Sequence, residues 1–102
     1  MAQLHVIEKL TLTEQIDKVE QIWSTGYWKL SEERARALID GDLYLHKKKA
    51  SPSFFGGIIT GYRVEEAGDY AGRITFTFKA DLAHKNVTAS PEGWKLEMKF
   101  IP

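Results

Sequence analysis

The sequence predicts an α+β fold with two helices in the N-terminal half and a bent, mainly antiparallel sheet of about five or six strands. Apolar residues recur at helical spacing before residue 42 and alternate with polar residues at strand spacing after it. Glycines inside the 54–64 segment add the kinks that a small β-barrel needs to close. We therefore expect a small barrel with helices beside it.

Composition limits the class of protein. With 102 residues, the chain is expected to form a single domain, 1–102, and without cysteine it has no disulfide or thiolate metal site. A formal net charge of zero argues against a strongly cationic nucleic-acid module. The N-terminus lacks the basic and apolar regions of a signal peptide, and no apolar window has the length of a membrane span. We therefore expect a cytoplasmic protein with no membrane association.

The first half predicts one strand and two helices. Residues 4–7 are typical of a covered strand, and Thr11 with Glu14 has the spacing of a capping box, with Thr13 as a competing cap. Gly26 is expected to end this first helix. Its apolar stripe consists of Leu12, Ile16, Val19, Ile22 and Trp23.

The second helix is expected to begin at the cap Ser31 and to end at Gly41, with Glu32 and Glu33 well placed in its first turn. The strand that follows, 43–46, places its two leucines on one face and Tyr44 and His46 on the other.

Three further strands are expected, over 54–64, 73–79 and 94–100. In the first of them, Gly56, Gly57 and Gly61 indicate a bulge, a sharp coil, or the close approach of another backbone or a ligand. Residues 81–90 are expected to form a loop or a short helical turn. The predicted core consists of Leu43, Leu45, Ile58, Ile74, Phe76, Phe78, Leu96 and Met98.

Two features suggest a binding site. Trp23, Tyr27 and Trp28 surround a glycine turn, and such aromatics either plug one end of a barrel or wall a pocket for a flat ligand. The lysine run 47–49 is either a solvated turn or a contact for phosphate. The expected ligand-binding residues are Trp23, Tyr27, Trp28, Tyr44, His46, Lys47, Lys48, Ser53, Phe55, Gly56 and Gly57.

Signals for catalysis and cofactors are missing from the sequence. The three histidines lie on separate elements without metal-ligand spacing, so no metal site is expected. No phosphate-binding glycine loop, serine elbow or cysteine nucleophile is present, so neither a cofactor nor a catalytic residue is expected. His46 is either a structural histidine or a ligand-contacting acid or base.

The segment from Asp40 to Glu66 contains Gly41-Asp42, an apolar strand that ends in His46, a short polar turn, and Phe55-Gly-Gly-Ile-Ile. This pattern resembles the core of the PUA-like superfamily, to which the EVE, YTH and ASCH domains belong. It implies a small, partly open barrel flanked by helices, with a cleft for a base that is often modified. The double glycine departs from the family pattern.

Three functions follow as hypotheses. The first is a non-catalytic module for nucleic acid or a possibly modified nucleotide, with a base on Trp28 or Tyr27 and phosphate at the lysine run 47–49. The second is a small hydrolase of a modified nucleoside, which needs a lysine or histidine paired with a carboxylate in the cleft, for example His46 with Asp42 or Glu65. The third is a protein-interaction module, for example an inhibitor in a defence or toxin system, with a protein partner.

Overall fold

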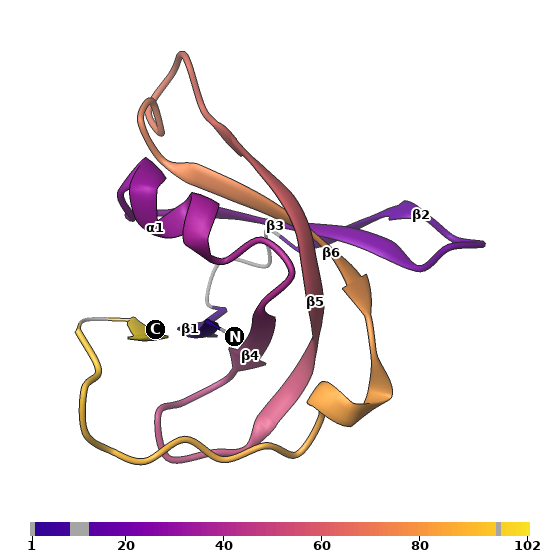
Figure 1. The fold of residues 1–102 in the computed structure, drawn as a ribbon, viewed down its shortest axis with the longest axis vertical. Helices are drawn as coiled ribbons and strands as arrows, with labels where there is room; N and C mark the ends of the chain where they lie inside the picture. Colours follow the sequence, from indigo (N-terminus) through magenta and orange to yellow (C-terminus); the bar gives the residue numbers. More distant parts are fainter. Residues whose placement is uncertain (1, 9–12, 96) are drawn as a thin grey trace.

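The computed structural model describes residues 2–8, 13–95 and 97–102. In this part of the chain, seven strands form one mixed sheet in the order β2-β3-β6-β5-β4-β1-β7, accompanied by one short α-helix (Figure 1). Neighbouring strands are antiparallel except for β1 and β4, which are parallel. The elements are β1 (Gln3–Ile7), β2 (Glu14–Asp17), β3 (Ile22–Trp28), α1 (Glu32–Ala37), β4 (Asp42–His46), β5 (Ser53–Val64), β6 (Ile74–Ala80), the 3-10 turn η1 (Leu82–His84) and β7 (Met98–Ile101).

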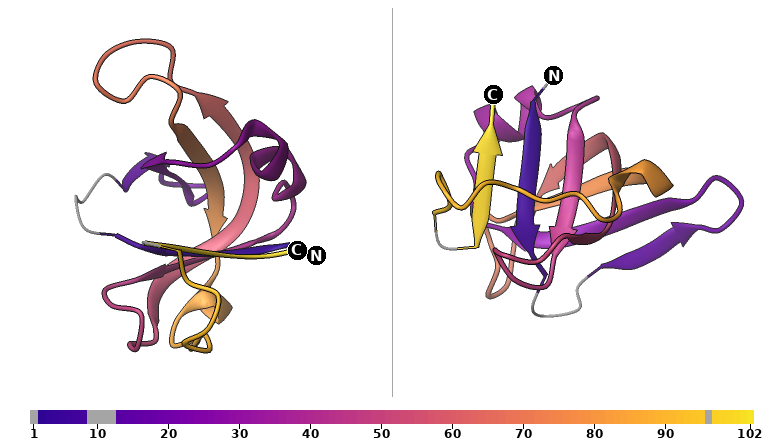
Figure 2. Two further views of the ribbon diagram at one scale, coloured as in Figure 1. Left: turned by 90° about the vertical axis from the view of Figure 1, so that its left-hand side faces the viewer. Right: turned by 90° about the horizontal axis from the view of Figure 1, so that it is seen from below.

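The sheet is strongly curved but open. β1, β4 and β7 form a layer that lies beneath β3 and β6, and the long strand β5 bends from one layer to the other (Figure 2). The two ends of the strand order do not pair with each other in the described residues. The expected α+β fold, a small barrel of five or six strands with two helices, is therefore wrong: the described residues form one open, mostly β sheet with one short helix.

The predicted first helix is instead a β-hairpin made by β2 and β3. The backbone N–H groups of Val19 and Glu20 donate to the Asp17 carboxylate and stabilise the turn. Two members of the predicted apolar stripe are exposed, Ile16 at 56% and Val19 at 89%, so no helical face is buried there. Thr11 and Leu12 lie outside the described residues.

The second predicted helix is confirmed as α1, although it ends earlier than expected. The Ser31 hydroxyl accepts a hydrogen bond from the Arg34 N–H, which is the expected N-cap interaction. Ala35 and Leu38 are fully buried on its inner face. α1 spans six residues, and no helix in the described part of the chain has the length and apolar character needed to cross a bilayer.

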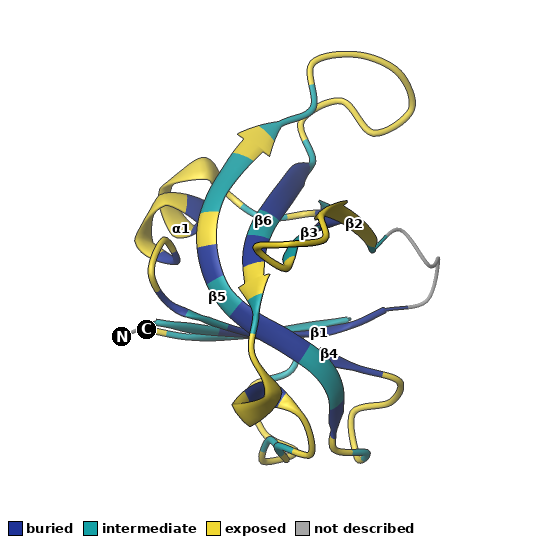
Figure 3. Ribbon diagram, turned by 90° about the vertical axis from the view of Figure 1, so that its right-hand side faces the viewer, coloured by how far each residue is buried: buried dark blue, intermediate teal, exposed yellow. Residues whose placement is uncertain are grey.

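The register of β5 against β4 and β6 decides which of its side chains enter the core. Ile58 pairs with Asp42 and is only partly buried, whereas Ile59 is fully buried, so the prediction for Ile58 is wrong. The β5–β6 register shifts between Ile59 and Gly61, which brings Tyr62 onto the same side as Ile59. Figure 3 shows how buried, intermediate and exposed stretches follow one another along β5.

The remaining core predictions fall as follows. Met98 is partly buried, and Leu96 lies outside the described residues. The buried apolar cluster, which confirms five of the predicted residues, comprises Leu4, Val6, Trp28, Ala35, Leu38, Leu43, Leu45, Ile59, Ile74, Phe76 and Phe78.

Candidate functional site

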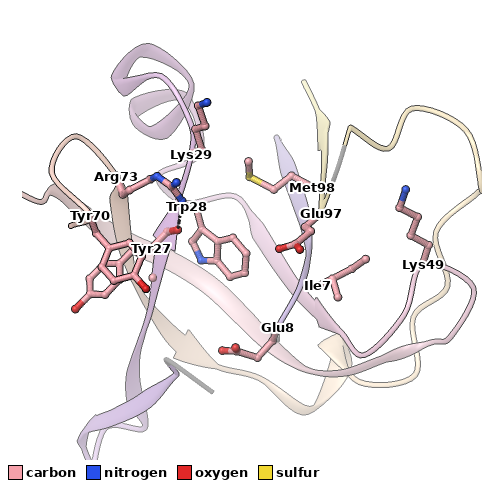
Figure 4. Close-up of a pocket in the computed structure, with 11 residues that line it drawn as sticks. Ile7, Glu8, Tyr27, Trp28, Lys29, Lys49, Tyr70, Arg73, Glu97 and Met98 are labelled. Atoms are coloured by element: carbon pink, nitrogen blue, oxygen red, sulfur yellow. Dashed lines mark hydrogen bonds between the residues drawn. The ribbon is translucent and has the colours of Figure 1, made fainter. Parts of the chain in front are cut away.

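A cleft of about 590 Å³ opens where β3 faces the ends of β1 and β7 (Figure 4). The curvature of the sheet brings these strands, which are far apart in the strand order, to opposite walls of one space. The lining residues are Ile7, Glu8, Gly26, Tyr27, Trp28, Lys29, Lys49, Tyr70, Arg73, Glu97 and Met98.

One wall of the cleft carries a stacked pair of tyrosines. The ring centroids of Tyr27 and Tyr70 are 4.6 Å apart with an interplanar angle of 23°. The Arg73 guanidinium donates to the Tyr27 carbonyl at 3.4 Å and lies 6.0 Å from the Tyr70 ring centroid. A Cβ on Gly26 would lie 2.7 Å from the Thr75 hydroxyl oxygen, so glycine lets β3 approach β6 at this wall.

Two buried polar side chains lie deeper in the cleft. Trp28 is 7% exposed, and its indole nitrogen has no hydrogen-bond partner in the described structure. Glu8 is 8% exposed, and its carboxylate accepts a hydrogen bond from the Thr13 hydroxyl. The Thr13 and Thr25 hydroxyl oxygens are 3.0 Å apart, so this chain of hydrogen bonds ties the end of β1 to β3.

The charge of the cleft is mixed. Lys29 and Lys49 are exposed, Arg73 is half-buried, and Glu8 and Glu97 contribute carboxylates. Cations are therefore available at the rim for an anionic group, while the buried carboxylate of Glu8 favours hydrogen-bond donors inside.

The structure separates the residues that the sequence suggested for one site. Tyr27 and Trp28 line the cleft, together with Lys49 from the lysine run. Lys47 lies with its ammonium 4.4 Å from the Phe54 ring centroid, and Lys48 is exposed away from the cleft lining.

Trp23 and Phe55 belong to the core side of the sheet. Their ring centroids are 5.0 Å apart in an edge-to-face contact, and Phe55 contacts Phe78 in the same way at 5.7 Å. Both aromatics pack against the buried cluster, which accounts for their size without a ligand.

Gly56, Gly57 and Ser53 serve strand and loop packing. A Cβ would lie 2.1 Å from the Leu43 carbonyl oxygen if added to Gly56, and 1.9 Å from the Lys79 carbonyl oxygen if added to Gly57. The glycines therefore admit a neighbouring backbone. The Ser53 hydroxyl donates to the His84 carbonyl at 2.6 Å and accepts from the Val87 N–H at 3.0 Å, which holds the segment after η1.

Tyr44 and His46 belong to a separate group, the histidine cluster, defined as His5, Tyr44, His46, His84 and Trp94. The coil 85–95, which contributes Trp94, crosses β7, β1 and β4 in the right-hand view of Figure 2. The Tyr44 ring is stacked between His5 at 4.6 Å and His84 at 5.0 Å, measured between centroids. Trp94 meets His5 and His46 edge-on.

Hydrogen-bond partners indicate which ring nitrogens of the histidine cluster carry a proton. His46 Nδ1 lies 2.9 Å from the Ser51 carbonyl oxygen, which can only accept, so this nitrogen carries a proton. Neutral His46 then accepts at Nε2 from His5 Nδ1, 2.8 Å away. Burial first, and then repulsion from His46 when that ring is protonated and from Lys99, lowers the pKa of His5 to about 4.

The acid–base pairs proposed for a hydrolase are wrong. Asp42 accepts from His84 Nε2 at 2.9 Å instead of from His46. Glu65 accepts from the Thr75 hydroxyl and the Arg63 guanidinium, and these two contacts lower the pKa of its carboxyl group. Within the described residues, no three His, Cys, Asp or Glu side chains are grouped to hold a metal ion.

Comparisons with protein-family models, curated proteins and solved structures find no match to this chain. The resemblance of 40–66 to the PUA-like superfamily therefore stays a prediction.

Sequence reasoning missed most of the cleft lining. Tyr70 and Arg73 lie at the end of the polar connection after β5, where an aromatic and an arginine on a glycine-rich loop are a recognisable signal of binding. Glu8 directly follows the covered strand β1, and a carboxylate at that position was a second signal.

Proposed function

We propose that the cleft binds a nucleotide, free or within a nucleic acid, without catalysing a reaction. The observation that carries this proposal is the stacked Tyr27–Tyr70 pair with the Arg73 guanidinium beside it. Aromatic faces stack on bases, and cations at a cleft mouth attract phosphate. The volume of about 590 Å³ is in the range of ligand pockets.

The base-stacking surface in this proposal differs from the one suggested by the sequence. Trp28 is buried, so its ring has little free face for a ligand, whereas Tyr27 is partly exposed and stacks on Tyr70, which is exposed. Of the lysine run 47–49, only Lys49 lines the cleft, so in this proposal Lys49 and Lys29 are the phosphate contacts, and Lys47 and Lys48 are not.

Calorimetric titration with nucleoside monophosphates and short oligonucleotides at two salt concentrations tests the proposal. Tyr27→Ala is expected to weaken binding by about 1 to 3 kcal/mol, the usual value of one stacking contact. Replacing Lys29 and Lys49 together by alanine should also lower the salt dependence of the affinity.

Two matched controls come from the same chain. Arg73→Gln removes the guanidinium beside the tyrosine pair, and Arg63→Gln, at an exposed arginine paired with Glu65, is its matched control. The Lys47 and Lys48 double variant is the control for the cleft lysines. Folded protein that binds none of these ligands, or equal losses in the variants and controls, would overturn the proposal.

A further inference from the structure

Glu8 and Trp28 give the cleft two buried groups of opposite hydrogen-bonding character. Glu8 follows the end of β1 and Trp28 ends β3, and both side chains project into the cleft in Figure 4. The carboxylate accepts hydrogen bonds and the indole N–H donates one. The indole nitrogen is buried and has no hydrogen-bond acceptor among the described residues. A ligand bound in the cleft would supply this acceptor.

The Glu8 carboxylate retains capacity for further donors. An ionised carboxylate has about four lone-pair sites, and the Thr13 hydroxyl uses one of them on Oε2. The contact between Thr13 and Thr25 fixes the position of this hydroxyl and therefore orients the carboxylate. A carboxylate held in this way is matched by two adjacent N–H donors on one planar edge.

We propose that the cleft selects a guanine base, an inference that rests on the proposed nucleotide binding. Guanine presents its ring N1–H and its 2-amino group side by side, with the O6 acceptor next to them. The two donors match the Glu8 carboxylate and O6 matches the Trp28 indole N–H. Adenine, cytosine and uracil each present a single donor group on the corresponding edge, so they leave the carboxylate less well paired.

Inosine and xanthosine monophosphates isolate the 2-amino group. Inosine monophosphate lacks this group, and xanthosine monophosphate carries an oxygen in its place, which faces the carboxylate unfavourably. In calorimetric titration of the full chain, guanosine monophosphate is expected to bind about tenfold or more tightly than inosine monophosphate, because the hydrogen bond is to a charged acceptor. Xanthosine and adenosine monophosphates are expected to bind more weakly than guanosine monophosphate.

Glu8→Gln should remove the preference for guanosine over inosine monophosphate, while Glu14→Gln, an exposed glutamate on β2, should retain it. Trp28→Phe should weaken guanosine monophosphate binding several-fold through loss of the donor to O6. The wild-type comparison of ligands needs no variant, so it decides the question even if a variant fails to fold.

The outcomes separate this inference from the proposed function. Equal binding of all these nucleotides, or a preference that survives in folded Glu8→Gln, overturns guanine selection but leaves nucleotide binding in place. Absence of binding to every nucleotide overturns both. A guanosine preference that is lost in Glu8→Gln and kept in Glu14→Gln supports the inference.

Discussion

The buried histidine cluster makes the stability of the fold depend on pH. His5 is 2% exposed. Its ring stacks on Tyr44, its Nδ1 contacts His46, and its partner on strand β7 is Lys99, so the charged form of His5 is disfavoured. Burial, together with repulsion from Lys99 and from His46 when it is protonated, lowers the pKa of His5 from 6.5 to about 4 in the folded state. In the unfolded chain the ring takes up a proton below pH 6.5.

The sign and size of the effect follow from linkage. Because the folded pKa is the lower one, the unfolded state binds more protons between pH 6.5 and pH 4. The contribution of His5 is therefore complete above pH 6.5 and is lost as the pH falls to about 4. A pKa that falls from 6.5 to about 4 corresponds to a loss of about 3 kcal/mol in the free energy of unfolding.

Urea unfolding at several pH values between 7.5 and 4 measures this loss, and NMR titration of the imidazole resonances measures the pKa of His5 directly. His5→Gln keeps a donor for His46 but cannot titrate, so its stability should fall less steeply in the same pH window. Carboxylates titrate in both proteins, which makes the difference between the two curves specific to His5.

A second variant probes the cause of the lowered pKa. Lys99 is buried, and its ammonium donates to the Ser90 carbonyl and hydroxyl. Lys99→Met should raise the pKa of His5, whereas Lys79→Met, at an exposed lysine paired with Glu20, should leave it unchanged. A measured pKa of 6 or higher for His5 in the folded wild type, or identical pH curves for wild type and His5→Gln, would refute this reasoning.

Two further predictions concern the sheet. Gly57→Ala should destabilise the protein by about 1 to 3 kcal/mol, because the added Cβ meets the Lys79 backbone. Gly61→Ala should cost less, because the nearest neighbour of its Cβ is the Thr77 hydroxyl at 3.3 Å. Equal losses of stability in urea unfolding would contradict this prediction. Val19→Thr should change stability by no more than about 0.5 kcal/mol, because Val19 is 89% exposed in the hairpin, and a larger loss would indicate that this segment is buried.

The sequence predicted well those elements whose signals are local. The Ser31 cap predicted α1, and the alternation of large apolar residues predicted β4 and β6 together with buried Leu43 and Phe76. Capping and period-two alternation are properties of a few consecutive residues, so they survive in the folded protein. The interior glycines of β5 likewise indicated a register shift, which occurs just before Gly61.

Long-range pairing decided the elements that the sequence assigned wrongly. The 12–23 segment has helical spacing, but β3 pairs with β6, where Trp23 lies opposite Phe78, and this contact outweighs a local pattern. The choice of Ile59 over Ile58 depends on register with β4 and on the shift in β5, which periodicity alone does not specify.

The sites also depend on tertiary structure. The sequence alone suggested that the aromatics near Gly26 either plug a barrel or wall a pocket. It also suggested that His46 is either structural or functional. Curvature of the sheet brought Tyr27 opposite the end of β1 and made the cleft, while parallel pairing of β1 with β4 placed His5 beside Tyr44 and His46. Such neighbours are separated by tens of residues in the chain, so only the pairing of distant strands, driven by burial of their apolar faces, decides which side chains meet.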